Sequence, residues 1–386
     1  MRKKQSILFV RPDYHCSFFY REQFRKAGWQ ADIFLPRGYP EALLYSGENL
    51  LKPPQIPRYD VFLLKVMNQL IFLFWWLTKF WRYEYHLYYG RPPVLNLYED
   101  RLGLYHLFGN GFLVELWLAK LFGVKLIYLP TGCLEDETKE NFSRLDDGNV
   151  CGNCGMWNKC DDKANELNFA RINRYFDMGI GTGSIDSTQF RMTHIKYKAI
   201  DLNLWRPDLS IPPEHQLPTT QNIRILHSAY LSKSGRDFQG RNIKGSPFVL
   251  AAIERLKNEG HSVEYLLIDD KPSNQMRFYQ AQADIVVEQL IYGWWGSTFV
   301  ETSALSKPVV CYLRPAWKEF FFKKFPEYTS LPVVEADTQS IYEVLKKLVT
   351  DVSFRRQKAE ESRRFAEMHF NPEQNIAELI KRLEAL

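Results

Sequence analysis

ADIVVEQLIYGWWGSTFVETSALSKPVVCYL, residues 283–313, is the stretch that decides the fold. Two short apolar runs, DIVVEQL and KPVVCYL, enclose a loop with two glycines and two tryptophans, followed by a short helical pattern. Continuous apolar runs of this length are typical of strands buried on both faces of a parallel sheet. The stretch therefore predicts a strand, a loop at the carboxyl end of that strand, a helix and the next parallel strand.

The same alternation continues on both sides of this unit. Before it, the expected strands are ILFV, ADIFL, DVFLLKV, PVLNLY, GLYHLF, KLIYLP, MGIGTG and IKYKAI. A proline-rich stretch, residues 204–222, reads as a linker, and the alternation restarts after it with IRILHSAY, VEYLLID and, beyond the opening stretch, LPVVEA. The last fifty residues are helical, and Asn371-Pro372 is a typical start for the final helix. We therefore expect an α/β protein with two Rossmann-like, doubly wound domains, residues 1–205 and 222–368, facing each other across a cleft.

Composition limits the class of partner. The chain has 386 residues, 45% hydrophobic and 25% charged, which fits a soluble protein of two domains. The formal net charge is only +5, so nothing in it requires nucleic acid. A zinc-containing nucleic-acid-binding protein is kept as an alternative, but CDDKANE and LEDE make the surroundings of its cysteines acidic.

The most apolar stretch is VMNQLIFLFWWLT, residues 66–78. Its 13 residues fall short of the ~20 needed to span a bilayer, and no signal peptide is evident, so we expect a cytoplasmic protein. The stretch fits either a buried core helix or an interfacial helix that lies on the inner face of the membrane. Basic and tryptophan residues that would suit the second interpretation are Lys65, Lys79, Arg82, Arg91, Trp75, Trp76 and Trp81.

The loop and helix of the opening stretch suggest an anion site. Glycines such as Gly296 let the backbone approach a ligand closely, and the N–H groups near Ser297 and Thr298 would begin a helix that attracts a diphosphate. Glu301, one turn into the helix, could accept hydrogen bonds from the two hydroxyls of a ribose. An ordinary capped helix is the alternative.

A second candidate loop is GRDFQGRNIKG, residues 235–245, which also follows a strand and precedes a helix. Arg236, Arg241 and Lys244 beside a glycine-rich turn would suit a diphosphate. A solvated basic loop is the alternative. Together the two loops favour a site for a doubly charged ligand at the carboxyl ends of the strands.

These residues resemble the retaining GT-B glycosyltransferases of family 4. The family pattern is Gly-Arg, then Lys-Gly and a helix, and later a strand, a glycine-rich loop, a Glu-Ala helix and Gly-Lys-Pro-Val. It appears here as Gly235-Arg236 or Gly240-Arg241, Lys244-Gly245 and GWWGSTFVETSALSKPVV. The resemblance covers most of residues 222–313 and implies the GT-B architecture, with the final helix, residues 369–386, crossing back to the first domain.

The resemblance also implies a function. It predicts transfer of a sugar from a nucleotide-sugar donor to a surface-polysaccharide or lipid-linked glycan acceptor, with retention and without a catalytic metal. The second domain would bind the donor, with Lys244 and an arginine at the diphosphate and Glu301 at the ribose. The first domain would bind the acceptor.

The sequence departs from the family pattern at two places. The first of two glutamates spaced eight positions apart is replaced by Gly293, and Glu288 on the preceding strand is the nearest acidic residue. The histidine that often ends the strand matching KLIYLPTG is absent, whereas His106 matches another frequent histidine position and is a candidate for catalysis or for a structural role. A GT-B-like protein that binds a nucleotide-sugar without turnover therefore stays as an alternative.

Four cysteines lie close together in the sequence, at Cys133, Cys151, Cys154 and Cys160. A Cys-x2-Cys pair with a third cysteine nearby can place three thiolates around one ion, and Cys133 would be the fourth ligand. We expect a structural zinc in this insert, residues 133–162, near the acceptor side of the cleft. Thiols without a metal, an iron–sulfur cluster and disulfides are the alternatives.

Overall fold

The structure is a computed structural model of the chain. It describes all residues except 1–4, 14, 37–43, 47–49, 55–61, 93–107, 110, 132–136, 141–149, 156–159, 182–186, 188, 228–236, 239–240 and 269–270, and it gives no side-chain description for 62–66, 237–238 and 241.

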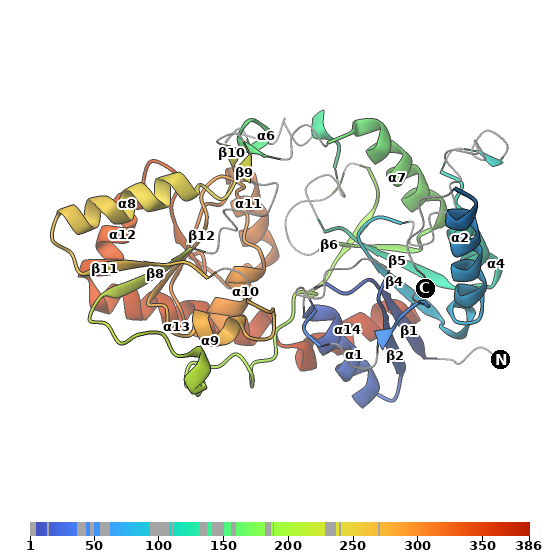
Figure 1. Ribbon diagram of the computed structural model, residues 1–386, viewed down its shortest axis with the longest axis horizontal. Coiled ribbons are helices and arrows are strands. Elements are labelled where there is room, and N and C mark those ends of the chain that lie inside the picture. Colours follow the sequence, from blue (N-terminus) through green and yellow to red (C-terminus); the bar gives the residue numbers. More distant parts are fainter. Residues whose placement is uncertain are drawn as a thin grey trace.

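A seven-stranded sheet forms the first domain (Figure 1). Its strands are β1 (Ser6–Val10), β2 (Gln30–Phe34), β3 (Leu50–Leu51), β4 (Tyr85–Tyr89), β5 (Lys125–Leu129), β6 (Met178–Gly181) and β7 (Met192–His194). They lie in the order β3-β2-β1-β4-β5-β6-β7 and pair in parallel. The helices of this domain are α1 (Cys16–Lys26), α2 (Phe62–Leu77), η2 (Phe80–Arg82), α4 (Val114–Leu121), α6 (Val150–Asn153) and α7 (Asp162–Tyr175). The strand order reverses between β1 and β4, which is the switch point of this doubly wound sheet.

A five-stranded parallel sheet forms the second domain, in the order β11-β8-β12-β13-β14. Its strands are β8 (Ile223–His227), β11 (Val263–Leu266), β12 (Ile285–Gln289), β13 (Val309–Cys311) and β14 (Val334–Glu335). A separate antiparallel hairpin joins β9 (Asp237–Phe238) and β10 (Arg241–Asn242). The helices are η4 (Pro213–His215) in the linker, α8 (Ser246–Asn258), α9 (Met276–Gln280), α10 (Ser297–Ala304), α11 (Pro315–Lys324), α12 (Ile341–Thr350), α13 (Val352–His369) and α14 (Pro372–Glu384). β12 is buried at every position, as its apolar run predicts.

The final helix crosses back to the first domain (Figure 1). The side chain of Asn371 accepts a hydrogen bond from the Glu373 N–H at 3.0 Å, with Pro372 as the first helical residue. α14 packs against α1, and its Leu379 and Leu383 belong to the core of the first domain. The predicted α/β architecture of two doubly wound domains with a crossing C-terminal helix is therefore confirmed.

Two predicted strands are wrong. DVFLLKV, residues 60–66, was expected as a strand, but residues from Phe62 onward belong to the single helix α2. IKYKAI, residues 195–200, follows β7 and is not itself a strand, although the Ile195 N–H still donates to the Gly181 carbonyl oxygen at 3.3 Å. A short apolar run fits a buried strand and a buried helix equally well, and the run of residues 66–78 that continues it has the length of a helix. PVLNLY lies outside the described residues, as does most of GLYHLF.

α2 has one buried and one exposed side. Residues 66–78 are therefore not a helix buried on all sides, and only one of their sides is free to lie on a membrane. Phe72 and Trp76 pack into a cluster under the sheet, and Trp76 is only 1% exposed. Trp76 therefore does not suit a headgroup zone, whereas Phe74 on the opposite side of α2 is 67% exposed. Within the described part of the chain, no helix is both long enough and apolar enough to cross a bilayer.

Candidate functional site

The switch point of the second sheet lies between β8 and β12, where ligands of doubly wound sheets bind. β8 ends at His227 and β12 carries Glu288 near its carboxyl end. α8 begins with Ser246 after the loop that carries Lys244, and α10 begins with Ser297 after the tryptophan loop. The two loops predicted from the sequence therefore meet at one edge of the sheet.

A buried histidine holds the Lys244 loop in place. His227 lies with Nδ1 2.8 Å from the Val287 carbonyl oxygen and Nε2 2.9 Å from Ser246 Oγ. The amide of Asn242 donates to the same hydroxyl at 3.0 Å, and the Lys244 N–H donates to Asn242 Oδ1 at 2.9 Å. Burial lowers the pKa of His227 to about 4, so its neutral ring is a fixed part of this network at pH 7.

The same loop is fixed to β12. The Leu290 N–H donates to the Lys244 carbonyl oxygen at 3.1 Å. Gly245 has φ +76°, and a Cβ there would lie 2.9 Å from Leu290 Cβ, so the close approach of the two segments needs glycine. The sequence did not reveal His227 or Asn242. The partners of His227 lie 19 and 60 positions away, and Asn242 lies in a loop without hydrophobic periodicity.

Glu288 is buried among these elements. Its Oε1 accepts a hydrogen bond from the Gly296 N–H at 2.7 Å. Burial raises the pKa of Glu288 to about 6, while the positive charge of Lys244 and the Gly296 N–H oppose the rise and the charge of Glu301 adds to it. The Gly296 N–H, predicted to face the donor, is therefore already used by a carboxylate of the protein. Ser297 and Thr298 follow at the half-exposed start of α10.

Glu301 joins the two domains. Its Oε2 accepts a hydrogen bond from the buried amide of Gln280, and its Oε1 lies 3.1 Å from His15 Nε2. His15 precedes α1, beyond the carboxyl end of β1, and packs against Trp205 with ring centroids 5.4 Å apart. Each carboxylate oxygen can accept a second hydrogen bond, so Glu301 keeps capacity for a ligand hydroxyl.

His15 is a residue that the sequence reasoning missed. It lies in YHCSFF directly after the first predicted strand, and a histidine at the carboxyl end of a central strand was the signal that could have found it.

The presence of glycine at position 293 has a structural cause. Gly293 has φ +91°, and a Cβ there would lie 2.2 Å from Cγ of Arg314. The buried Arg314 donates through its backbone N–H to the Gly293 carbonyl oxygen and through Nε to the Tyr292 carbonyl oxygen, each at 3.0 Å. Arg314 thus occupies the space that a glutamate would need at position 293, and it too was missed from the sequence.

Three predicted site residues cannot be placed. His106, Arg236 and Cys133 lie outside the described residues. Arg241 is on β10, but its side chain is not described.

The cysteine insert reaches the second domain. α6 lies against β10 (Figure 1), and Val150 belongs to the core cluster of the second domain, with Cys151 packed against it. Burial raises the pKa of Cys160, and Cys154 and Cys151 add to the rise. Among the described residues alone, no group of three or more His, Cys, Asp or Glu side chains is arranged to hold a metal.

Comparison with known proteins shows the fold. No protein-family model matches the chain, and its sequence matches no curated protein. HepE from Anabaena, solved with UDP and glucose, superposes with a TM-score of 0.60 at 15% identity over 98% of this chain and 99% of HepE. Sucrose-phosphate synthase from Thermosynechococcus elongatus gives a TM-score of 0.59 at 12% identity over 99% and 100% of the two chains.

A UDP-N-acetylglucosamine 2-epimerase is also similar, with a TM-score of 0.51 at 14% identity over 98% of this chain and 95% of the epimerase. This chain has the GT-B fold. At such low identity the likeness extends to the fold alone.

Proposed function

We propose that this chain is a glycosyltransferase that moves a sugar from a nucleotide-sugar donor to a surface-polysaccharide or lipid-linked glycan acceptor. The observation that carries the proposal is the contact of Glu301 with His15, because it builds one polar site from the carboxyl ends of β12 and β1 in the two domains. The complexes of HepE with UDP and with UDP-glucose support a donor of this class.

The donor would lie between the Lys244 loop and the start of α10. Lys244 would neutralise diphosphate charge, helped by the N–H groups of Ser297 and Thr298, which the helix dipole makes favourable for an anion. Glu301 would accept hydrogen bonds from the ribose. Such a site would work by positioning the substrates and by stabilising charge on the leaving phosphate, and the resemblance implies a reaction with retention and without a catalytic metal.

A nucleotide-sugar-binding protein without turnover is the second candidate. The observation that favours it is Arg314, which fills the space beside Gly293 where the family pattern places a carboxylate. A screen of nucleotide-sugars for a rise in melting temperature should identify the donor. Release of nucleotide that increases on addition of a glycan acceptor would support transfer. Binding without release, with every acceptor tried, would favour the second candidate.

We also propose a structural zinc in the insert, bound by Cys133, Cys151, Cys154 and Cys160. The Cys-x2-Cys spacing and the third cysteine nearby support it. The purified protein should contain about one zinc per chain, and Cys154→Ser should lower that content. Metal analysis that finds none, together with four thiols from this cluster that react in the native protein, would exclude the site.

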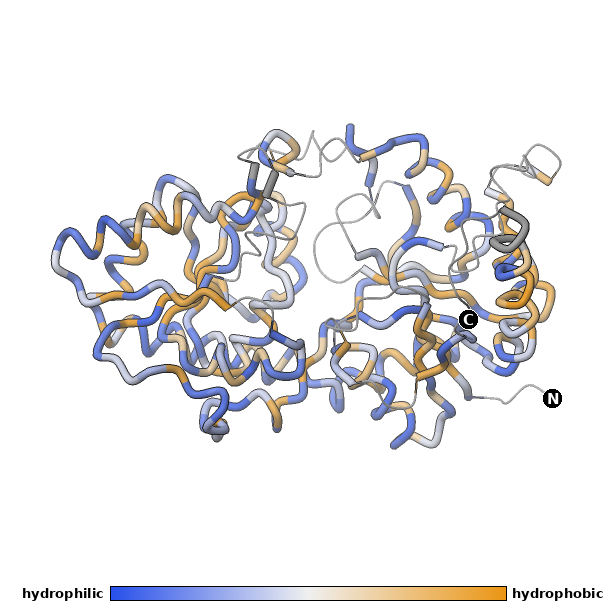
Figure 2. The backbone as a smooth tube through the Cα atoms, in the orientation of Figure 1, coloured by the Kyte–Doolittle hydropathy of each residue, from blue (hydrophilic) through white to orange (hydrophobic). Residues whose placement is uncertain are grey.

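The first domain carries an exposed apolar surface that suits a lipid-linked acceptor. We define the α2–α4 apolar surface by residues that are all more than two-fifths exposed: Met67, Leu70, Ile71, Phe74, Trp117, Leu121 and Phe122. The four residues of α2 follow the i, i+3, i+4, i+7 spacing of one helix side. Both helices pack into one cluster under the sheet, and Figure 2 shows their apolar segments together at the edge of the molecule.

We propose that this surface docks on an anionic bilayer. An exposed apolar patch of two helices is typical of a binding surface, and the half-buried Lys79 and the exposed Arg82 lie in the turn after α2. These cations complement anionic headgroups. A symmetric contact with a second copy would instead bring two such sets of like charge together. A surface-bound first domain would meet an acceptor that is anchored in the same membrane.

Sedimentation with vesicles tests the docking. Vesicles rich in phosphatidylglycerol should bind the protein at low salt and release it partly at high salt. Leu70→Glu with Phe74→Glu should abolish binding at an unchanged melting temperature, as should Lys79→Glu with Arg82→Glu. The matched control is Val352→Glu, at an exposed apolar residue of the other domain. Wild-type protein that ignores these vesicles at low salt would point to a soluble acceptor.

A further inference from the structure

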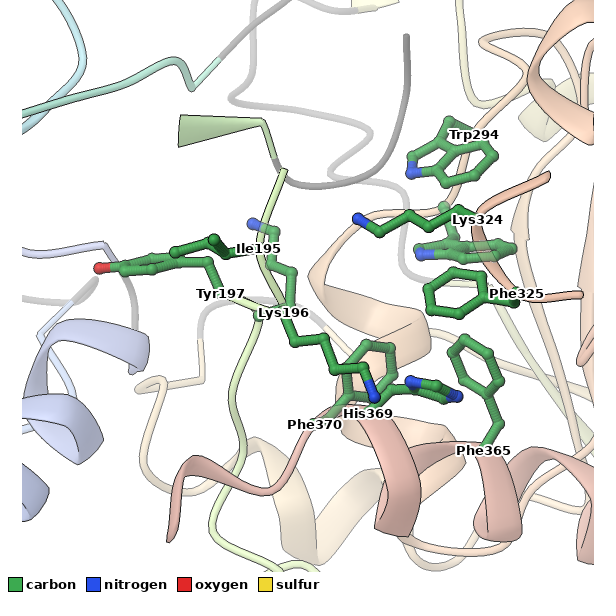
Figure 3. Close-up of a pocket in the computed structure, with 11 residues that line it drawn as sticks. Ile195, Lys196, Tyr197, Trp294, Lys324, Phe325, Phe365, His369 and Phe370 are labelled. Carbon is green, nitrogen blue, oxygen red and sulfur yellow. The ribbon is translucent and has the colours of Figure 1, made fainter. Parts of the chain in front are cut away.

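A pocket lies between the two domains, and its lining includes none of Lys244, Glu288 and Glu301 (Figure 3). The segment of residues 195–198 that follows β7 forms one wall, and Trp294, Lys324 and His369 belong to the opposite wall. The pocket is open to solvent and its enclosed volume is only about 30 Å³, so a phosphate group would sit in the open mouth between the two walls.

The polar side chains of this pocket are basic. Lys196 comes from the first domain and Lys324 from α11 of the second, and none of the lining residues is acidic. Figure 3 shows Lys196 beside the ring of His369 and Lys324 reaching across from the other wall. Lys198 also lines the pocket, but its charge acts on the buried carboxyl of Asp13.

Lys324 is held in an unfavourable environment, whereas Lys196 is exposed. Burial lowers the pKa of Lys324 to about 8, and the charge of Lys196 lowers it as well, against the opposing effect of Glu378. Like charges gathered in a half-buried space destabilise each other, and an anion between them would remove that cost.

His369 is a buried polar residue of this pocket. It is only 3% exposed, and its Nε2 lies 3.2 Å from the Tyr328 hydroxyl oxygen. Its Nδ1 has no hydrogen-bond partner among the described residues, although the ring lines the pocket. Burial lowers the pKa of His369 to about 4, and both lysines add to the effect.

We propose that Lys196, Lys324 and His369 form a binding subsite for a phosphate or diphosphate group that bridges the two domains. Two ammonium groups match the charge of a phosphate better than that of a carboxylate, and the aromatic walls exclude water around it. The group can belong to a prenyl-diphosphate acceptor or be a free phosphate anion. The subsite does not depend on the proposed transfer reaction, because Lys196, Lys324 and His369 are not among the residues proposed to bind the donor, although Trp294 in its wall belongs to the loop before α10.

Calorimetry on the full chain tests the subsite, with inorganic pyrophosphate and farnesyl diphosphate as probes. Lys196→Met and Lys324→Met should each weaken pyrophosphate binding by about tenfold. The matched control is Lys323→Met, at an exposed lysine of the same helix, and it should leave the affinity within about twofold. Lys244→Ala should remove any pyrophosphate bound at the proposed donor site and leave unchanged the binding that depends on Lys196 and Lys324, which separates the two sites.

The two sources of the anion give different results. Binding of farnesyl diphosphate at least tenfold tighter than pyrophosphate, and equally sensitive to Lys196→Met, would assign the subsite to a lipid-linked acceptor. Equal affinity for both probes would assign it to a free anion. Absence of pyrophosphate binding at about 10 mM, or a Lys196→Met, Lys324→Met double variant that binds like the wild type, would overturn the subsite.

Discussion

Replacing Glu288 with glutamine should stabilise the protein above pH 6. Burial raises the pKa of Glu288 from its usual 4.5 to about 6. Because the folded protein holds this proton more tightly than the unfolded chain, the stabilising contribution is fully present below pH 4.5 and is lost as the pH rises through 6. The gap between the two values corresponds to about 2 kcal/mol at 1.36 kcal/mol per pKa unit.

Glutamine keeps the shape and the carbonyl oxygen that accepts the Gly296 N–H, but it carries no charge to bury. Glu288→Gln should therefore raise the melting temperature at pH 8 by about 4–8 °C, at ~2–4 °C per kcal/mol for a domain of this size. At pH 4 the two proteins should melt together.

Thermal denaturation followed by circular dichroism between pH 4 and 8 measures this difference. Glu254→Gln is the matched control, since that carboxylate is 63% exposed on α8 and should show no such pH dependence. A Glu288→Gln variant that melts at a lower temperature than the wild type at pH 8 would refute the reasoning. A difference in melting temperature between the two proteins that is the same at pH 4 and pH 8 would also refute it.

Three further changes test the site. Lys244→Ala should weaken donor binding by about 1.5–3 kcal/mol in calorimetry, as expected for a charged hydrogen bond, and unchanged affinity would remove Lys244 from the diphosphate site. Glu301→Gln should lower turnover with a normal melting curve, whereas loss of folding would show that its contact with His15 is structural. Gly293→Ala should cost at least about 1 kcal/mol in chemical denaturation, because it combines a positive φ with a clash against Arg314, and a neutral effect would mean that Arg314 moves away freely.

Much of the fold follows from the sequence because its signals are local. The apolar runs of β1, β8, β12 and β13 have the length and composition of buried parallel strands. Asn371-Pro372 marks the start of α14 through the backbone geometry of the two residues themselves. The proximity of the Lys244 loop and Glu301 was also predictable, since the carboxyl ends of parallel strands share one edge of a sheet.

The rest depends on contacts between distant residues. Whether residues 60–66 form a strand or a helix is decided by what packs on them, and the side of α2 that is buried is decided by the sheet beneath it. His227 is neutral because the fold buries it, and no neighbour in the sequence reveals that.

The sequence by itself determined the alternation of strands and helices, the two-domain division and the candidate groups Lys244, Glu288 and Glu301. Only the tertiary structure placed His15 against Glu301 and gathered Lys196 and Lys324 around one pocket. The physical reason is that periodicity reports the burial of a residue's own segment, whereas a site between domains is made by side chains hundreds of positions apart that meet only after both sheets have formed.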